Sequence, residues 1–255
     1  MSPIETITSR ANPLCTLVRK LERDRSLRRE RRLFLGDGVK LYAEALKAGC
    51  LDTVLFTPGR QPELPPGVRA VQVPEHLMDA LSPAKTPQGV LFLCAMPELT
   101  LPRALEPGRY LVLDGLQDPG NVGTIWRTAD AFGAKGLILT HGCADPYAPK
   151  TVRASMGAAF RLNVWEAEPE EIAGCLERSG IPLYGTALRE DTVDLRRHSG
   201  GSAAVVIGSE GSGISQEMLS RCSRTYKIPM EPRCESLNAA VAASVVLWEL
   251  YRQEG

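Results

Sequence analysis

The sequence predicts an α/β protein in two parts, the second built on a mostly parallel sheet. Two observations lead to this prediction. Short β-branched or apolar runs alternate with helical stretches along most of the chain, which is typical of strands joined by crossover helices. Residues 96–108 contain three prolines and no clean periodicity, which indicates a linker. We therefore place a first domain at 1–96, a linker at 97–108 and a second domain at 109–255.

The first part alternates over short distances. We expect strands near 31–38, 51–57, 68–73 and 89–95, and helices at 39–49 and 74–81. Elements this short predict a compact α/β unit that precedes the larger sheet.

In the second part six apolar runs predict strands, with helical stretches between them. These runs are 110–116, 136–140, 162–166, 182–186, 203–208 and 225–229. A ligand of such a sheet binds beyond the carboxyl ends of its strands.

Two helices of the second part carry distinct patterns. A stripe that begins with Val122, Ile125 and Trp126 predicts a helix packed on the sheet, with Asn121 as its N-cap. Residues 237–251 are apolar nearly all round, so we expect a buried helix capped by Ser236.

Composition excludes several classes of protein. No apolar run reaches the roughly 18 residues of a membrane span, and the first residues lack the apolar core of a signal peptide, so we expect a cytoplasmic protein without a membrane partner. The 7 cysteines are scattered without a Cys-x-x-Cys pair, and the 3 histidines are not at ligand spacing. We expect reduced, mostly buried thiols and no metal.

The formal net charge of +0 conceals a basic segment. Nine basic residues against three acids lie between Arg10 and Arg32, and eight of the nine are arginines. Leucines and a valine at near-helical spacing let one face pack while arginines project outward. One interpretation is a solvated helix face; the one we favour is an RNA phosphate contact, with the candidates Arg19, Arg28, Arg29, Arg31 and Arg32.

Three loops at predicted strand ends carry unusual residues. The first leads into a helix whose N-terminus offers free N–H groups and which bears Arg127; the alternative is that Arg127 pairs with Asp130. The second, "IGSEGSGIS", has a G-x-x-G-x-G spacing that is neither the dinucleotide fingerprint nor a P-loop. Its Glu210 would repel phosphate, and a plain turn is the alternative. In the third, Asn238 needs hydrogen-bond partners, from a neighbouring loop or from a ligand.

Together the loops are more specific than any one of them. The segments "DPGNVGTIWRTADAFGA", "VVIGSEGSGIS" and "IPMEPRCESLNAAVAAS" resemble, in order and spacing, the three motifs of the SpoU/TrmH family of RNA 2′-O-methyltransferases. Upstream, "ITSRANPLCTLVRKL", "FLGDGVKLYAEALKAG" and "LSPAKTPQGV" resemble the small, ribosomal-protein-like RNA-binding domain of many members. Departures are Glu231-Pro232 where a glycine is usual, Ala239-Ala240 where Val-Ser is frequent, and "LGDG" in the first part.

The resemblance implies a SPOUT fold, in which the C-terminal segment is threaded into a deep trefoil knot. S-adenosyl-L-methionine would bind in the knot, and since it carries no phosphate, Glu210 is not out of place. By matching positions, the residues assigned to chemistry are Arg127, Asn121, Glu210, Ser236 and Asn238. Those assigned to the cofactor are Thr186, Leu188, Gly208, Ser209, Glu210, Gly211, Gly213, Ile228, Met230 and Leu237.

The resemblance further implies a homodimer that methylates RNA, with ribosomal RNA favoured over transfer RNA. An RNA-binding protein that keeps the fold without turnover is one alternative. An ordinary doubly wound nucleotide enzyme is another, but it would need a G-x-G-x-x-G after an early strand, and none is present.

Overall fold

The computed structural model describes residues 4–187, 189–234 and 236–253, which form two compact units. The first unit contains the chain up to Pro97 together with Tyr147–Phe160, and the second contains Glu98–Pro146 and the chain from Arg161 onward. The middle segment joins the first unit through aromatic packing, because the rings of Tyr147 and Phe160 lie 4.6 and 5.8 Å from that of Phe34.

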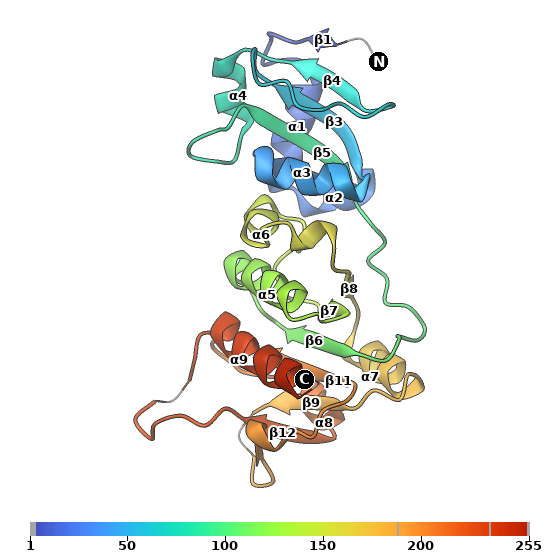
Figure 1. The fold of residues 1–255 in the computed structure, drawn as a ribbon, viewed down its shortest axis with the longest axis vertical. Coiled ribbons are helices and arrows are strands. Elements are labelled where there is room, and N and C mark those ends of the chain that lie inside the picture. Colours follow the sequence, from blue (N-terminus) through green and yellow to red (C-terminus); the bar gives the residue numbers. More distant parts are fainter. Residues whose placement is uncertain (1–3, 188, 235, 254–255) are drawn as a thin grey trace. The chain divides into compact units, whose positions relative to one another are not determined.

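The first unit is a five-stranded sheet with helices on it (Figure 1). The strand order is β1-β4-β3-β5-β2, and β5 runs antiparallel to both of its neighbours. Its elements are β1 (Glu5–Thr6), α1 (Pro13–Arg23), α2 (Arg25–Arg31), β2 (Leu33–Asp37), α3 (Val39–Ala48), β3 (Leu51–Phe56), β4 (Arg69–Gln72), α4 (Glu75–Leu81), β5 (Val90–Ala95), α6 (Pro149–Ala154) and a 3₁₀ turn, η1 (Ala158–Phe160).

Alternation along β5 supplies both faces of this sheet. Leu91 and Leu93 join a core with α1 and α4, whereas Phe92 meets the ring of Tyr42 on α3 at 5.5 Å. A strand whose successive side chains point to opposite faces serves two layers only if all of them are apolar, which explains the uninterrupted run in the sequence.

The basic segment forms two helices rather than one. Asp24 separates α1 from α2 with an extended backbone (φ −105°, ψ 106°), and its side chain accepts a hydrogen bond from the N–H of Leu27 at 3.0 Å. Since an aspartate that caps a new helix cannot also continue the old one, the single helical face expected here is broken at that residue.

The second unit is a seven-stranded sheet in which every pair is parallel, with the order β10-β12-β9-β11-β6-β7-β8. Its elements are β6 (Arg109–Asp114), α5 (Pro119–Ala131), β7 (Gly136–Leu139), β8 (Val164–Glu166), α7 (Pro169–Arg178), β9 (Leu183–Thr186), β10 (Val193–Asp194), η2 (Leu195–Arg197), β11 (Ala203–Gly208), α8 (Gln216–Arg221), β12 (Arg224–Lys227) and α9 (Ala239–Arg252). All six strands predicted for this part are present, so the parallel α/β class is confirmed.

Helices cover both faces of this sheet. Ile172 of α7 and Met218 of α8 share one core with Val112 and Val206 of the central strands. On the other side α9 lies beside α5 (Figure 1), and the Trp248 ring is 5.7 Å from that of Phe132.

The expectation of a wholly buried C-terminal helix is wrong for the single chain. Ala243, Val246 and Leu247 are buried, but Val241 and Trp248 are 49% and 51% exposed. One face of α9 packs on its own unit and the opposite apolar face remains uncovered.

Candidate functional site

The site forms where four parallel strands end. Gly208, the last residue of β11, is in register with Asp114, the last of β6, while β9 ends at Thr186 and β12 at Lys227. Parallel strands bring their carboxyl ends to one edge of a sheet, so residues that are far apart in sequence meet there.

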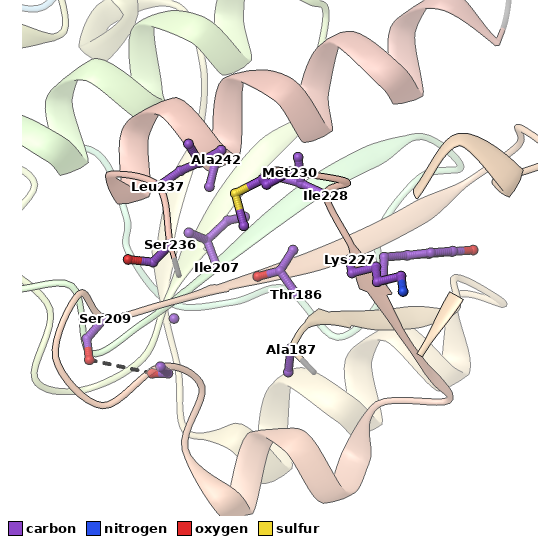
Figure 2. A pocket seen from close by; sticks show the side chains of 13 residues that line it. Thr186, Ala187, Ile207, Ser209, Lys227, Ile228, Met230, Ser236, Leu237 and Ala242 are labelled. Atoms are coloured by element: carbon purple, nitrogen blue, oxygen red, sulfur yellow. Dashed lines mark hydrogen bonds between the residues drawn. The ribbon is translucent and has the colours of Figure 1, made fainter. Parts of the chain in front are cut away.

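A cavity opens at this edge (Figure 2). Its lining includes seven of the residues predicted for the cofactor: Thr186, Gly208, Ser209, Gly213, Ile228, Met230 and Leu237. Ser236, predicted for the chemistry, also lines it. Figure 2 places Met230, Leu237 and Ala242 on one side of the cavity, across from Thr186 and Ala187.

Two predicted cofactor residues, Glu210 and Gly211, line a neighbouring cavity instead, and Leu188 lies outside the described residues. Sequence reasoning missed five residues of the first cavity: Ala187, Ile207, Tyr226, Lys227 and Ala242. A usable signal existed for Ile207 and Lys227, since each is within one residue of a predicted contact at the end of a parallel strand.

The glycine loop after β11 is held by its own backbone. Ser209 and Gly213 form an isolated antiparallel bridge, with N–H to carbonyl distances of 3.0 Å in both directions. A Cβ on Gly208 would lie 2.2 Å from the carbonyl carbon of Gly213, and Gly213 has a positive φ of 67°. Both positions therefore require glycine, one because of a close backbone approach and the other because of its conformation.

Side chains of all three predicted motifs meet in one hydrogen-bond chain. Nδ2 of Asn121 donates to Oε1 of Glu210, and Nδ2 of Asn238 donates to Oδ1 of Asn121 at 3.2 Å. The sequence proposed a neighbouring loop or a ligand as partner of Asn238, and the neighbouring loop is a partner in this structure.

Both expected helix caps are displaced. Asp118 caps α5 by accepting from the N–H of Asn121 at 2.9 Å, which places Asn121 inside the first turn. Asn238 caps α9 by accepting from the N–H groups of Ala240 and Val241 at 2.9 and 3.3 Å, so Ser236 is not the cap. In each case an aspartate or asparagine with a non-helical backbone takes the role.

Arg127 is exposed on α5. The alternative pairing with Asp130 is wrong, because Asp130 binds Arg161 at 2.6 Å. No hydrogen bond or ion pair engages the Arg127 guanidinium within the described part of the chain, and none joins it to Asn121 or Glu210, so its charge is available to a ligand.

The first cavity suits a nucleoside that lacks phosphate. Its walls combine the apolar side chains of Ile207, Met230 and Leu237 with the hydroxyls of Thr186 and Ser209. Among its described lining residues the only basic one is Lys227, whereas a phosphate site gathers several cations or a helix N-terminus. S-adenosyl-L-methionine, with an adenosine, an apolar chain and no phosphate, fits these walls.

The basic segment only partly matches its prediction. Arg28 is buried and its guanidinium donates to the carbonyl of Leu21, so its assignment to RNA is wrong. Arg19 donates to the carbonyls of Cys15 and Arg10 at 3.2 and 2.7 Å. Arg31 and Arg32 are exposed and Arg29 is half-buried.

The cysteines are free, and five of the seven are buried, as expected. Burial raises the pKa of Cys143, and it raises that of Cys222 to about 11, so both are held as neutral thiols. The described residues contain no group of three or more potential metal ligands. Over the same residues no helix is both long and apolar enough to cross a membrane.

Comparison with known proteins places the chain in a family. The profile of the SpoU rRNA Methylase family matches residues 108–248, more than half of the chain. The chain belongs to the SpoU rRNA methylase family. An MRM3-like substrate binding domain matches residues 12–91. The family that the three motifs predicted is thus confirmed.

Relatives of this SpoU family chain cover most of its length. It is 33% identical over 220 residues to the 23S rRNA (guanosine(2553)-2′-O)-methyltransferase RlmP of Bacillus subtilis, covering 85% of this chain and 88% of the relative. It is 34% identical over 237 residues to the 23S rRNA (uridine(2479)-2′-O)-methyltransferase of Streptomyces viridochromogenes, covering 86% and 83%. An AdoMet-bound rRNA methyltransferase from Sinorhizobium meliloti superposes with a TM-score of 0.88 at 30% identity, covering 98% of both chains.

Proposed function

We propose that this protein is an S-adenosyl-L-methionine-dependent RNA 2′-O-ribose methyltransferase that acts on large-subunit ribosomal RNA. The observation that carries the proposal is the convergence of the three family motifs, through Asn121, Glu210 and Asn238, at the edge of the cavity that fits the cofactor. Relatives named for ribosomal RNA favour that substrate over transfer RNA. Acting on ribosomal RNA, the enzyme would work in the cytoplasm.

Binding of the cofactor would rest on apolar walls and loop backbone. Ile228, Met230 and Leu237 would hold its apolar parts, and Thr186 with the loop Gly208–Gly213 would supply polar contacts. When bound, the cofactor supplies a methyl group on a positively charged sulfur.

The chain's own residues must position the ribose and stabilise the charge that develops on its oxygen. A guanidinium is permanently protonated, so we assign Arg127 to the RNA phosphate and the nascent oxyanion rather than to proton removal. Asn121, Glu210 and Asn238 would fix the walls around it, and Ser236 would face the reacting groups from the cofactor side.

Three structural expectations remain part of the proposal. The segment after β12, which returns to α5 through the Asn238–Asn121 bond, would be the threaded strand of a deep trefoil knot. The uncovered face of α9 would form a homodimer interface. Residues 1–96 would form an RNA-binding domain, joined by the linker 97–108 to a catalytic domain at 109–255.

The decisive experiment measures cofactor binding and methyl transfer separately. Calorimetry should detect S-adenosyl-L-methionine or its demethylated product, and radiolabelled methyl should transfer to ribosomal RNA from cells that lack this gene. Arg127→Ala should reduce turnover at least about a hundredfold, as expected for a lost oxyanion contact, with cofactor affinity retained. Arg161→Ala, which removes a guanidinium engaged with Asp130, is the matched control and should keep turnover. Absence of cofactor binding, or full activity of Arg127→Ala, would refute the assignment.

A further inference from the structure

A second cavity, of about 430 Å³, adjoins the cofactor cavity. Both are lined by Ser209 and Gly213, so the bridged loop after β11 is the wall between them. The second cavity lies beyond the ends of β6 and β11, where Asp114 and Gly115 contribute to its lining. Its volume is within the range of small-molecule sites.

The walls of this second cavity are polar and acidic. They carry the carboxylates of Asp114 and Glu210, the amide of Gln117 and the hydroxyls of Ser209 and Ser212. No lysine or arginine occurs among its described lining residues. Two carboxylates without a cation repel a phosphate, so the occupant must be polar and uncharged.

Some of these polar groups already have structural partners. Asp114 accepts from the hydroxyl of Thr140 at 2.9 Å and from the N–H of Ser215 at 2.6 Å, which ties the sheet to the start of α8. The hydroxyls of Ser209 and Ser212 bond each other at 2.7 Å. These contacts hold the wall in shape.

Two polar groups remain for an occupant. The amide of Gln117 is exposed, and no hydrogen bond engages it within the described chain. Glu210 uses Oε1 for Asn121, and over the same residues no partner is found for Oε2. An amide offers a donor and an acceptor, and a carboxylate accepts from amino and imino groups, which is the combination that binds the edge of a nucleobase.

We propose that this cavity receives the base of the acceptor nucleotide, presented by single-stranded RNA, and that Gln117 contacts the edge of that base. The inference rests on the proposed function. In a nucleotide, the base is attached to the carbon next to the one that bears the 2′-hydroxyl. A hydroxyl that reaches the cofactor cavity therefore has its base within one sugar ring of it, and the second cavity lies across one loop. Bases splayed from single-stranded RNA are read in this way.

Photocrosslinking tests the placement without relying on the activity of a mutant. The wild-type enzyme first identifies the nucleotide it methylates in ribosomal RNA from cells that lack this gene. A benzophenone amino acid in place of Gln117 is then irradiated with that RNA and S-adenosylhomocysteine. The crosslink should map to the methylated nucleotide or its immediate neighbour. A crosslink elsewhere, or none from a protein that still binds the cofactor, would overturn the proposal.

Kinetics provide the second readout. Gln117→Ala should raise KM for RNA about tenfold, the size of one lost base contact, while cofactor affinity and chain stability stay at their wild-type values. Gln216→Ala, an exposed amide at the start of α8 that does not line the cavity, should match the wild type. Equal KM values for Gln117→Ala and the wild type would refute the role of Gln117. A wild-type enzyme that transfers no methyl to RNA would refute the proposed function instead.

Discussion

Asn238 performs two tasks with one amide. Its Oδ1 accepts from the N–H groups of Ala240 and Val241 at the start of α9, while its Nδ2 donates to Oδ1 of Asn121 on α5 at 3.2 Å. Helix capping and the link between motifs therefore depend on opposite ends of the same group, and substitution can separate them.

Asn238→Asp should keep the cap and lose the link, because a carboxylate accepts but does not donate. We expect wild-type stability with methyl transfer reduced at least tenfold. Asn238→Ala should lose both functions, with an additional cost of about 1 kcal/mol from the missing cap. Urea unfolding and methyl-transfer assays measure the two effects; equal stability loss in both variants would contradict this division.

The glycine loop offers a matched pair of substitutions. A Cβ on Gly208 would lie 2.3 Å from the backbone nitrogen of Ile214, whereas at Gly211 no atom lies within 4 Å. Gly208→Ala should destabilise the second unit by about 1–3 kcal/mol through overpacking and abolish cofactor binding. Gly211→Ala should unfold at the wild-type urea concentration. Calorimetric and urea titrations of both variants check the contrast.

His198 should make stability depend on pH. Its Nδ1 lies 3.2 Å from the Tyr226 hydroxyl and its Nε2 is buried without a partner. Burial lowers the pKa of His198 below its ordinary value of 6.5, outweighing the carboxylate of Glu249, which raises that pKa. The unfolded chain then binds the proton more readily, so stability is present above pH 6.5 and is lost as the pH falls below it.

The test compares the slope of unfolding free energy between pH 7.5 and 5.5, pH values chosen to bracket the ordinary histidine pKa of about 6.5. His198→Phe should lessen the loss by up to about 1.4 kcal/mol per pH unit, the limit for one proton. His76→Gln, at an exposed position, should keep the wild-type slope. An unchanged slope in His198→Phe would mean that another group titrates.

The uncovered face of α9 should hold the proposed homodimer together. Val241, Val245 and Trp248 recur at helical spacing and are 49%, 37% and 51% exposed, so a charge among them would have to be buried in the interface. Trp248→Glu should yield monomers in sedimentation at micromolar concentration. Val39→Glu, at an apolar position of similar exposure on α3, should leave the dimer intact, and a dimeric Trp248→Glu would place the interface elsewhere.

Buried and exposed arginines of the basic segment should respond differently. Arg28→Ala should lower stability, because its guanidinium bonds the carbonyl of Leu21 inside the fold. Arg31→Ala should leave stability unchanged, weaken RNA binding and reduce the salt dependence by about 0.7 per lost phosphate contact on a single strand. Filter binding at several salt concentrations, with urea unfolding, tests both. An RNA affinity unaffected by Arg31→Ala would favour a solvated face.

The sequence predicted the strands well, because uninterrupted apolar runs such as the one in β11 have no other way to be buried. Caps were harder to predict. Asp118 and Asn121, or Ser236 and Asn238, are competing residue types within three positions, and the choice depends on which backbone is extended. Asp24 likewise breaks a pattern whose leucines continue across it.

Other features were beyond local pattern. The packing of Tyr147 on Phe34 joins residues more than a hundred positions apart and has no period to reveal it. The exposure of Val241 depends on how much of α9 its own unit covers, which composition does not determine. The meeting of Asn121, Glu210 and Asn238 followed from family motifs, and only the fold specified who bonds whom.

Because Tyr147–Phe160 belongs to the first unit while its flanking residues belong to the second, the chain passes between units three times rather than once. A protease that cleaves only in 97–108 would leave two covalent tethers in place, so the nicked protein should remain a single particle under native conditions. A fragment that starts at residue 109 would carry an orphaned piece of another core, with aromatic rings of Tyr147 and Phe160 stripped of their Phe34 partner and prone to aggregation.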